Sequence, residues 1–277
     1  MYACKLDWRD SELEIINWKE MLYTYEQAVA ELTVKFTSMM EDYRRLGMYS
    51  PIDSVSGRVK KSSSILEKAS RKHIPMDRIE QEVEDIAGVR ILCRFVEDIY
   101  KVIDLIRMRD GKDMTIVEEK DYITNTKPSG YRSFHIVIKY PMFTAKGYCE
   151  VLAEIQIRTL AMNFWATAEH SLKYKYSGNI PEDLQKRLIN CAEAAFHLDQ
   201  EMATIRTEIM YAQRLNEIKN NLVASIIDDI QNLYHVAKFE DVDDLNKKFI
   251  DLFEEGDIEK LKQFNEQLNI MTELYRA

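Results

Sequence analysis

The sequence lacks the features that mark secreted, zinc-binding and membrane-spanning proteins. Its cysteines are few and scattered, with no C-x-x-C motif and no paired histidine spacing: Cys4, Cys93, Cys149 and Cys191. This pattern favours reduced thiols in a cytoplasm and argues against a structural zinc site. The N-terminus has no basic segment followed by an apolar core, so we expect no signal peptide. No run of about 18 apolar residues is present, so we expect no membrane span.

Glycine and proline are scarce outside the middle of the chain. All five prolines and seven of the eight glycines lie between Gly47 and Pro181, and only Gly256 lies beyond them. This distribution predicts long helices in the flanks and turns between short elements in the middle. The N-terminal flank also carries an apolar stripe at helical spacing. The stripe consists of Leu22, Tyr25, Val29, Leu32, Phe36 and Met39.

The middle of the chain predicts an α/β (α+β) fold, in which helices flank a mixed sheet of about five strands. Helices are expected at residues 62–72, 76–85, 98–109 and 160–176, and strands at 88–96, 114–119, 131–140 and 150–159. A further extended piece follows Gly57. From Pro181 onward we expect helices, which end in two amphipathic segments separated by Gly256.

The net charge of −9 is unevenly distributed. Residues 44–175 carry more Lys and Arg than Asp and Glu, whereas both flanks are acidic. A basic middle suits a phosphate-bearing ligand, although chance clustering of solvated charge explains the count equally well. The segment "SGRVKKSSSILEKASRK" concentrates these cations, and the serines at the start of its helix leave backbone amides for an anion. A solvated basic face is the ordinary explanation for such a run.

Strand alternation places polar side chains together on one face of the strand at residues 150–159. Glu154, Gln156 and Arg158 share that face, while the alternate residues are apolar. The neighbouring strand likewise carries Tyr131 and His135 at its entry end. Burying such groups in a core is costly, so the pattern favours a cleft over a packed interface.

Two carboxylates are candidates for a metal site. Asp85 precedes the strand that carries Arg90, and Glu154 lies in the strand at residues 150–159. If these strands are neighbours, the two carboxylates meet and suit Mg²⁺, which takes further oxygens from water and nucleotide phosphates. The alternative is that Asp85 caps a turn while Glu154 pairs with Arg158.

The segment "KPSGYRSFH" places an aromatic residue beside a tight turn. Tyr131 follows Gly130 and is flanked by Lys127 and Arg132. Gly130 allows a sharp turn, and Tyr131 would serve either as a core residue or as a stacking surface for a base.

Together, "GRVKKSSSILEK", "EDIAGVRI", "SGYRSFH" and "EIQIRTLAMNFWATAEHSLKYK" resemble the small alarmone synthetases, the stand-alone synthetases of the RelA/SpoT homologue family. The resemblance implies a nucleotidyltransferase-like synthetase domain over residues 45–210, after a helical region at 1–44. The segment at 211–277 is longer than expected for a small synthetase, and we expect it to be a helical extension for oligomerisation or partner binding. It also implies GTP/GDP pyrophosphokinase activity, in which the 3′-hydroxyl of GTP or GDP attacks the β-phosphorus of ATP and AMP leaves.

The resemblance also implies a role for each motif residue. Asp85 and Glu154 would hold Mg²⁺, with Glu154 also the base for the 3′-hydroxyl. The ATP site would consist of Arg58, Lys60, Lys68, Arg71 and Arg90. The GTP or GDP site would consist of Lys127, Tyr131, His135, Gln156 and Asn163. Tyr131 would stack on guanine, and Arg58 and Arg90 would sandwich adenine.

Other expectations concern partners and rival functions. The chain has no adjacent His-Asp pair, the mark of the family's hydrolase domain, so we expect synthesis without degradation. The resemblance implies a cytoplasmic homo-oligomer, a tetramer in one branch, with an allosteric alarmone or single-stranded RNA as further ligands. Two alternatives stay open: pyrophosphate transfer to adenosine nucleotides or tRNA, and a non-catalytic nucleotide- or RNA-binding module.

Overall fold

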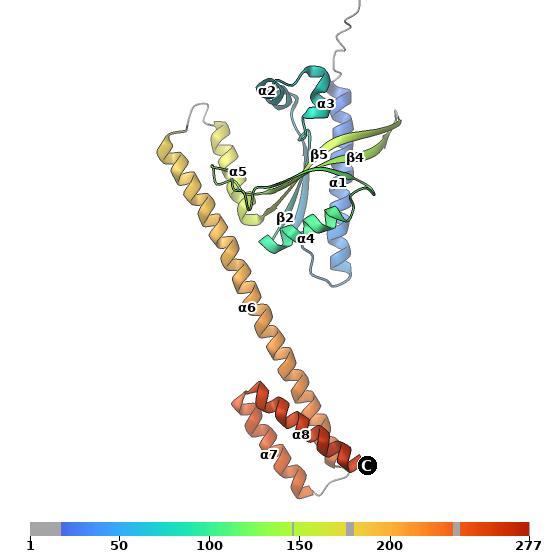
Figure 1. Cartoon of the computed structure of the whole chain (residues 1–277), viewed down its shortest axis with the longest axis vertical. Helices are drawn as coiled ribbons and strands as arrows, with labels where there is room; N and C mark the ends of the chain where they lie inside the picture. The colour runs from blue at the N-terminus through green and yellow to red at the C-terminus, as the bar shows by residue number, and fades with distance from the viewer. Residues whose placement is uncertain (1–17, 146, 176–179, 235–238, 277) are drawn as a thin grey trace, which may run out of the picture. The chain divides into compact units, whose positions relative to one another are not determined.

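The computed structural model describes residues 18–145, 147–175, 180–234 and 239–276. The chain forms two compact units, Met1–Ala203 and Thr204–Ala277. The first contains the sheet and the second is helical (Figure 1). The sequence-derived boundaries near residues 44 and 210 stay predictions. Among the described residues, no helix has the length and apolar character needed to cross a membrane.

The first unit alternates short helices and strands, as the glycine and proline distribution predicts. Its elements are α1 (Trp18–Arg45), β1 (Ser54–Val59), α2 (Ser62–Lys72), η1 (Met76–Arg78), α3 (Ile79–Glu82), β2 (Ala87–Cys93), α4 (Val96–Arg107), β3 (Thr115–Asp121), β4 (Phe134–Thr144), β5 (Gly147–Thr159), α5 (Leu160–Lys175) and the beginning of α6 (Glu182–Tyr234). The mixed five-stranded sheet has the order β1-β2-β5-β4-β3. Only the β2–β5 pair is parallel; the other three pairs are antiparallel. The predicted fold class is therefore confirmed.

One face of the sheet is apolar and lies under helices. Ala153, Ile155 and Ile157 of β5 are fully buried there, in one core with residues of α1 and α4. The predicted stripe of α1 belongs to this core: Tyr25, Leu32 and Phe36 are almost completely buried, while Leu22 and Met39 pack at its edge. Burying one face of the sheet leaves the opposite face for polar side chains.

The extended piece after Gly57 is part of a complete strand, β1, which pairs with β2. Gly57 is required here because α1 crosses close to the strand. A Cβ atom at Gly57 would lie 2.4 Å from Val29 Cγ1 and 2.6 Å from Thr33 Oγ1. The close approach brings Arg58 to the sheet beside β2, which positions one wall of the pocket described below.

Two predicted elements have different boundaries in the structure. The helix expected at residues 76–85 is reduced to η1 and α3, because Ile79 and Val83 both enter the core and Val83 adopts an extended conformation. The strand expected at residues 131–140 begins at Phe134 instead. The three preceding residues belong to the loop that follows Gly130, whose φ of +83° breaks the extended path.

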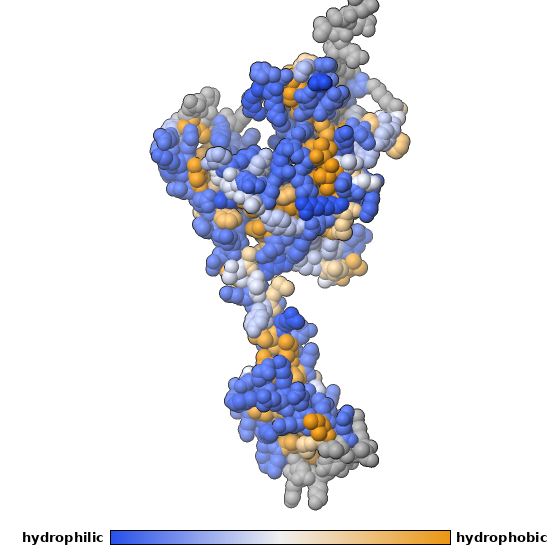
Figure 2. Space-filling model, in the orientation of Figure 1, coloured by the Kyte–Doolittle hydropathy of each residue, from blue (hydrophilic) through white to orange (hydrophobic). Residues whose placement is uncertain are grey.

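The second unit packs the end of α6 with α7 (Phe239–Glu255) and α8 (Ile258–Arg276). Its own core consists of Ile226, Ile230, Leu233, Val242, Leu261, Phe264 and Leu268. Gly256, at φ +75°, ends α7, and Asp257 then accepts the backbone N–H groups of Glu259 and Lys260 at the start of α8. The two segments predicted around Gly256 are confirmed. Figure 2 shows that hydrophilic residues cover most of the visible face of the chain, with smaller hydrophobic patches between them.

A buried carboxylate ties α6 to the end of β5. Asp199 is 5% exposed, and its Oδ2 accepts a 2.6 Å hydrogen bond from Thr159 Oγ1. Burial raises the pKa of Asp199 to about 6, although the hydrogen bond from Thr159 opposes the shift. The folded state therefore binds this proton more tightly than the unfolded chain, and stability falls as the pH rises from about 4 to about 6.

We expect Asp199→Asn to raise the free energy of unfolding at pH 8 by about 1–3 kcal/mol. Asparagine removes the buried charge, and its amide oxygen still accepts the hydrogen bond from Thr159. At pH 5, where wild-type Asp199 is mostly protonated, the difference should nearly vanish. Urea denaturation at the two pH values tests this, with exposed Asp228→Asn on the same helix as control. An equal difference at both pH values would contradict the assignment.

Candidate active site

The polar face of the sheet carries two rows of side chains that cross all five strands. The first row is Arg58, Gly88, Glu154, Val137 and Glu118. The second row is Ser56, Arg90, Gln156, His135 and Lys120. Members of the two rows are two residues apart on each strand, so their side chains point to the same face. The register therefore gathers residues from five separate segments.

A pocket of about 140 Å³ opens on this face over β1, β2 and β5. Its lining consists of Ser56, Gly57, Arg58, Asp85, Gly88, Val89, Arg90, Glu154 and Gln156. The structure thus brings together five residues that the sequence singled out: Arg58, Asp85, Arg90, Glu154 and Gln156. The predicted meeting of Asp85 and Glu154 follows from the β2–β5 pairing, in which Gly88 is the partner of Glu154.

Asp85 is held by two lysines. Lys60 Nζ lies 2.5 Å from Oδ2 and Lys68 Nζ lies 2.7 Å from Oδ1. Burial alone would raise the pKa of Asp85, but the hydrogen bonds and charges of both lysines lower it below its usual value. Asp85 is therefore ionised at neutral pH. The two side chains that contact the carboxylate of Asp85 are both lysines, which disfavours a purely turn-capping role.

Glu154 is ionised for a different reason. Its Oε1 lies 2.9 Å from His135 Nδ1, and its Oε2 accepts a 2.6 Å hydrogen bond from Gln156 Nε2. Burial would raise the pKa of Glu154, but the hydrogen bond and charge of His135, followed by the bond from Gln156, lower it. The alternative pairing of Glu154 with Arg158 is not observed in the described part of the structure, where Arg158 instead donates to Gln156 and Tyr131.

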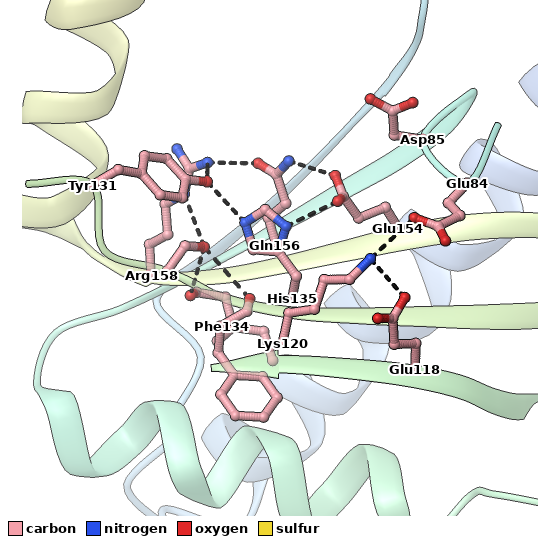
Figure 3. Close-up of polar contacts among 12 residues, drawn as sticks. Glu84, Asp85, Glu118, Lys120, Tyr131, Phe134, His135, Glu154, Gln156 and Arg158 are labelled. Atoms are coloured by element: carbon pink, nitrogen blue, oxygen red, sulfur yellow. Dashed lines mark hydrogen bonds and ion pairs between the residues drawn. The ribbon is translucent and has the colours of Figure 1, made fainter. Parts of the chain in front are cut away.

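Five side chains form a closed ring of hydrogen bonds (Figure 3). Beyond the two bonds to Glu154, Arg158 Nη2 donates to Gln156 Oε1 at 2.8 Å and to Tyr131 OH at 2.5 Å. Tyr131 OH lies 2.8 Å from His135 Nε2 and completes the ring. His135 therefore bridges Tyr131 and Glu154 through its two ring nitrogens. The ring links the carboxylate to the aromatic residue.

Tyr131 lies among cations and other rings. Arg158 Cζ and Lys127 Nζ are both 5.0 Å from the centre of its ring, and Lys127 Nζ is 4.1 Å from that of Tyr122. Tyr122 also meets His135 edge to face at 5.2 Å. Burial lowers the pKa of Lys127, as do the charges of Lys120 and Arg158, while the charge of Glu154 opposes them. This side of the site therefore combines stacking surfaces with positive charge.

Two predicted binding residues carry buried polar atoms without a hydrogen-bond partner. They are Arg90, through Nε, and Asn163 of α5, through Oδ1. Burial lowers the pKa of Arg90, and the neighbouring charges of Arg158 and Arg58 lower it further. An unpaired buried polar group and guanidinium groups that lie close together both raise the free energy of the site. A polar or anionic ligand would lower that free energy by supplying hydrogen bonds or negative charge.

The structure places some residues differently from the prediction made from the sequence. Arg71 lies exposed near the end of α2 and does not line the pocket. Tyr122 and Lys120 belong to the site but have no predicted role, and Arg158 was expected on the polar strand face without a place in either nucleotide site. Arg158 was identifiable by its position on the same strand face as Glu154, whereas Lys120 reaches the site only through the β3–β4 register. Lys120 forms ion pairs with Glu118 at 2.6 Å and Glu84 at 3.2 Å (Figure 3).

The donor set decides which metal the pocket suits. No group of three or more His, Cys, Asp or Glu side chains in the described part of the chain is placed to hold a metal. The pocket instead offers two ionised carboxylates, Asp85 and Glu154, with only oxygen donors. This set fits Mg²⁺, which retains water and takes its remaining ligands from nucleotide phosphates.

Comparison with known proteins gives consistent matches. A family model described as "Region found in RelA / SpoT proteins" matches residues 57–179. GTP pyrophosphokinase YjbM of Bacillus subtilis is 54% identical over 196 residues, which cover 71% of this chain and 92% of the relative. The crystal structure of small alarmone synthetase 1 from Bacillus subtilis, bound to its product pppGpp, matches with a TM-score of 0.66 and 54% identity over 69% of this chain and 97% of that chain.

A second structure of small alarmone synthetase 1 from Bacillus subtilis, bound to AMPCPP, matches with a TM-score of 0.62 and 49% identity. It covers 70% of this chain and 98% of that chain. These relatives are matched almost throughout their length, at an identity that establishes common ancestry. The chain belongs to the small alarmone synthetases of the RelA/SpoT family.

Proposed function

We propose that the chain transfers the β,γ-pyrophosphate of ATP to the 3′-hydroxyl of GTP or GDP, forming pppGpp or ppGpp and AMP. Two relatives carry the name GTP pyrophosphokinase, and a solved structure of small alarmone synthetase 1 from Bacillus subtilis holds pppGpp. The observation that carries the proposal is the pocket itself. Its lining includes both Asp85 and Glu154, which come from segments far apart in the sequence, together with Arg58 and Arg90.

The donor side of the pocket would bind ATP. Arg58 and Arg90, on neighbouring strands, offer two guanidinium planes for the adenine. Lys60 and Lys68 now neutralise Asp85, and the triphosphate would draw them away because it carries more negative charge than one carboxylate. Asp85 is then free to act as a metal ligand. Arg71 lies at the exposed end of α2 and would contribute to ATP binding only from there.

Asp85 and Glu154 would hold Mg²⁺. When bound, the ion neutralises charge on the transferring phosphates. On loading, the lysines would thus pass from Asp85 to phosphate oxygens, and Asp85 and Glu154 would be left to hold the metal.

The acceptor side would bind the guanosine nucleotide. Tyr131 would stack on guanine, and Lys127 would contact the phosphates, with Gln156 and Asn163 bordering the same space. In the structure both nitrogens of His135 are engaged, one with Tyr131 and one with Glu154. We therefore assign His135 first to orienting these two residues. A contact between His135 and the acceptor's phosphates would require one of these bonds to open.

The reaction itself requires little covalent chemistry from the protein. The 3′-oxygen forms a bond to the β-phosphorus, the bond from that phosphorus to the bridging α–β oxygen breaks, and AMP leaves. Glu154 is ionised and accepts the hydroxyl proton, while His135 and Gln156 keep its oxygens oriented. Catalysis then depends mainly on positioning and charge neutralisation, as in other transfers of this type.

The decisive assay is incubation with ATP, Mg²⁺ and each of GTP, GDP and GMP, with products resolved by anion exchange. We expect AMP to appear in equal amount to a 3′-pyrophosphorylated guanosine nucleotide. Reactions with adenosine nucleotides and with tRNA test the rival acceptors, because stacking on Tyr131 does not select guanine by itself. ATP binding without AMP release in any mixture would instead indicate a non-catalytic module.

A further inference from the structure

The loop that carries Tyr131 is fastened to α6. We call residues 127–133 the acceptor loop. Its turn is closed by a 2.8 Å hydrogen bond from Gly130 N to Lys127 O. On one side the loop joins the ring of hydrogen bonds through Tyr131. On the other side, Gly130 and Arg132 contact α6, so consecutive residues of one short loop face two different parts of the unit.

The first contact is a close approach of backbone to helix. A Cβ atom at Gly130 would lie 2.6 Å from Ala192 Cβ and 3.7 Å from Ile189 Cα. Only a residue without a side chain fits there, and φ of +83° independently favours glycine. The loop backbone therefore lies directly against α6.

The second contact is an ion pair. Arg132 is 9% exposed, and its Nη2 lies 2.9 Å and 3.1 Å from the two carboxylate oxygens of Glu193 on α6. Its guanidinium carbon also lies 4.3 Å from the ring centre of Phe196, on the next turn of the helix. Arg132 Nη1 returns to the loop, 3.4 Å from the carbonyl oxygen of Gly130. One buried guanidinium group thus joins loop and helix.

The third contact places the aromatic ring itself. Tyr131 packs against a small cluster of buried residues, Trp165, Ala166 and Ala192. Trp165 Nε1 in turn donates a 2.9 Å hydrogen bond to the carbonyl oxygen of Leu188 on α6. The orientation of Tyr131 therefore depends on α5 and α6 as well as on its own strand.

We propose that Glu193 is a positioning residue for the acceptor nucleotide: it holds Arg132, and through it the acceptor loop and the ring of Tyr131. The proposal rests on the proposed function, which makes Tyr131 the stacking surface. Without Glu193 the buried guanidinium group has no counter-charge and must move toward water. The loop then samples other arrangements, and the nucleotide can bind only the fraction in which the ring is in place.

The effect of removing Glu193 should be confined to the binding of the guanosine nucleotide. The residues assigned to ATP lie on β1, β2 and α2 or, for Lys60, directly after β1, whereas Glu193 on α6 is paired with Arg132. We expect Glu193→Ala to raise the KM for GDP about tenfold, equivalent to about 1.4 kcal/mol. The KM for ATP should stay unchanged, and Glu193→Gln, which keeps the shape and one hydrogen bond, should give an intermediate KM for GDP. Glu201→Ala, an exposed glutamate on the same helix, is the matched control.

Steady-state kinetics and calorimetric titration of GDP into the full chain test the proposal together. A KM for GDP in Glu193→Ala equal to that of the wild type would overturn it. So would an equal rise in both KM values, because the ion pair would then serve only the fold. If Glu193→Ala does not fold, Glu193→Gln decides by the same criterion.

Failure of the proposed function has a separate signature. If the wild type binds GDP but forms no product, the activity is wrong, and the dissociation constants for GDP still test the role of Glu193. If the wild type binds no guanosine nucleotide at all, both proposals fall.

Discussion

Replacing Glu154 by glutamine is expected to lower kcat by about 10³-fold or more, the range of a lost general base. The change removes the proposed proton acceptor and one of the two proposed metal ligands in a single step. It also disturbs the ring of hydrogen bonds: when the new amide oxygen accepts from Gln156, the new NH2 group faces the Nδ1–H group of His135, which is also a donor. ATP and GDP should still bind, since the stacking residues and lysines remain.

The matched control is Glu150→Gln. Glu150 lies on the same face of β5, four residues earlier, but it is exposed and outside the pocket. Turnover in single-turnover and steady-state assays should be unaffected by this change. If Glu154→Gln turns over at a rate close to that of the wild type, Glu154 is neither the base nor a required ligand, and the mechanism fails.

Removing the ring of Tyr131 is expected to act on substrate binding instead. Tyr131→Ala should raise the KM for the guanosine substrate about 5- to 150-fold, as expected for a stacking contact of about 1–3 kcal/mol. The KM for ATP should change little. Tyr131→Phe keeps the ring but loses the hydroxyl that meets Arg158 and His135. It should therefore retain most of the affinity for the acceptor while lowering kcat, because the support of Glu154 weakens.

Tyr148→Ala serves as control, since Tyr148 is exposed, lies on the same sheet and belongs to neither the pocket nor the ring. Equal changes in the KM values of both nucleotides in Tyr131→Ala would indicate general loosening of the site. An unchanged KM for GDP would show that Tyr131 is only a packing residue.

The sequence predicted the parts of the fold that depend on local pattern. Helical spacing placed α1, and strand alternation separated the apolar face of β5 from the face that carries Glu154 and Gln156. The motif resemblance named five of the nine residues that line the pocket. Local pattern failed where tertiary contacts decide: Val83 leaves the helix expected at residues 76–85 because its side chain enters the core.

The connections within the site were beyond prediction for the same reason. That Lys60 and Lys68 both reach Asp85 depends on how α2 and the segment before β2 meet in the tertiary structure, and that Arg158 meets Tyr131 depends on the β4–β5 register. Nothing in the sequence indicates a role for Glu193, because a glutamate on a long helix is ordinarily a solvated residue. Its partner, Arg132, lies 61 residues earlier in the chain.

The parallel pairing of β2 with β5 also sets when the site can form during synthesis. Ala87 can pair with Ala153 only after the ribosome has added the 66 residues that separate them, which takes about 3–13 s at ordinary ribosomal speeds. Until then one edge of β2 has unpaired backbone groups beside the apolar side chains of Val89 and Ile91. Nascent chains that stop before β5 should therefore be prone to aggregate and dependent on chaperones, whereas chains that extend past it should not.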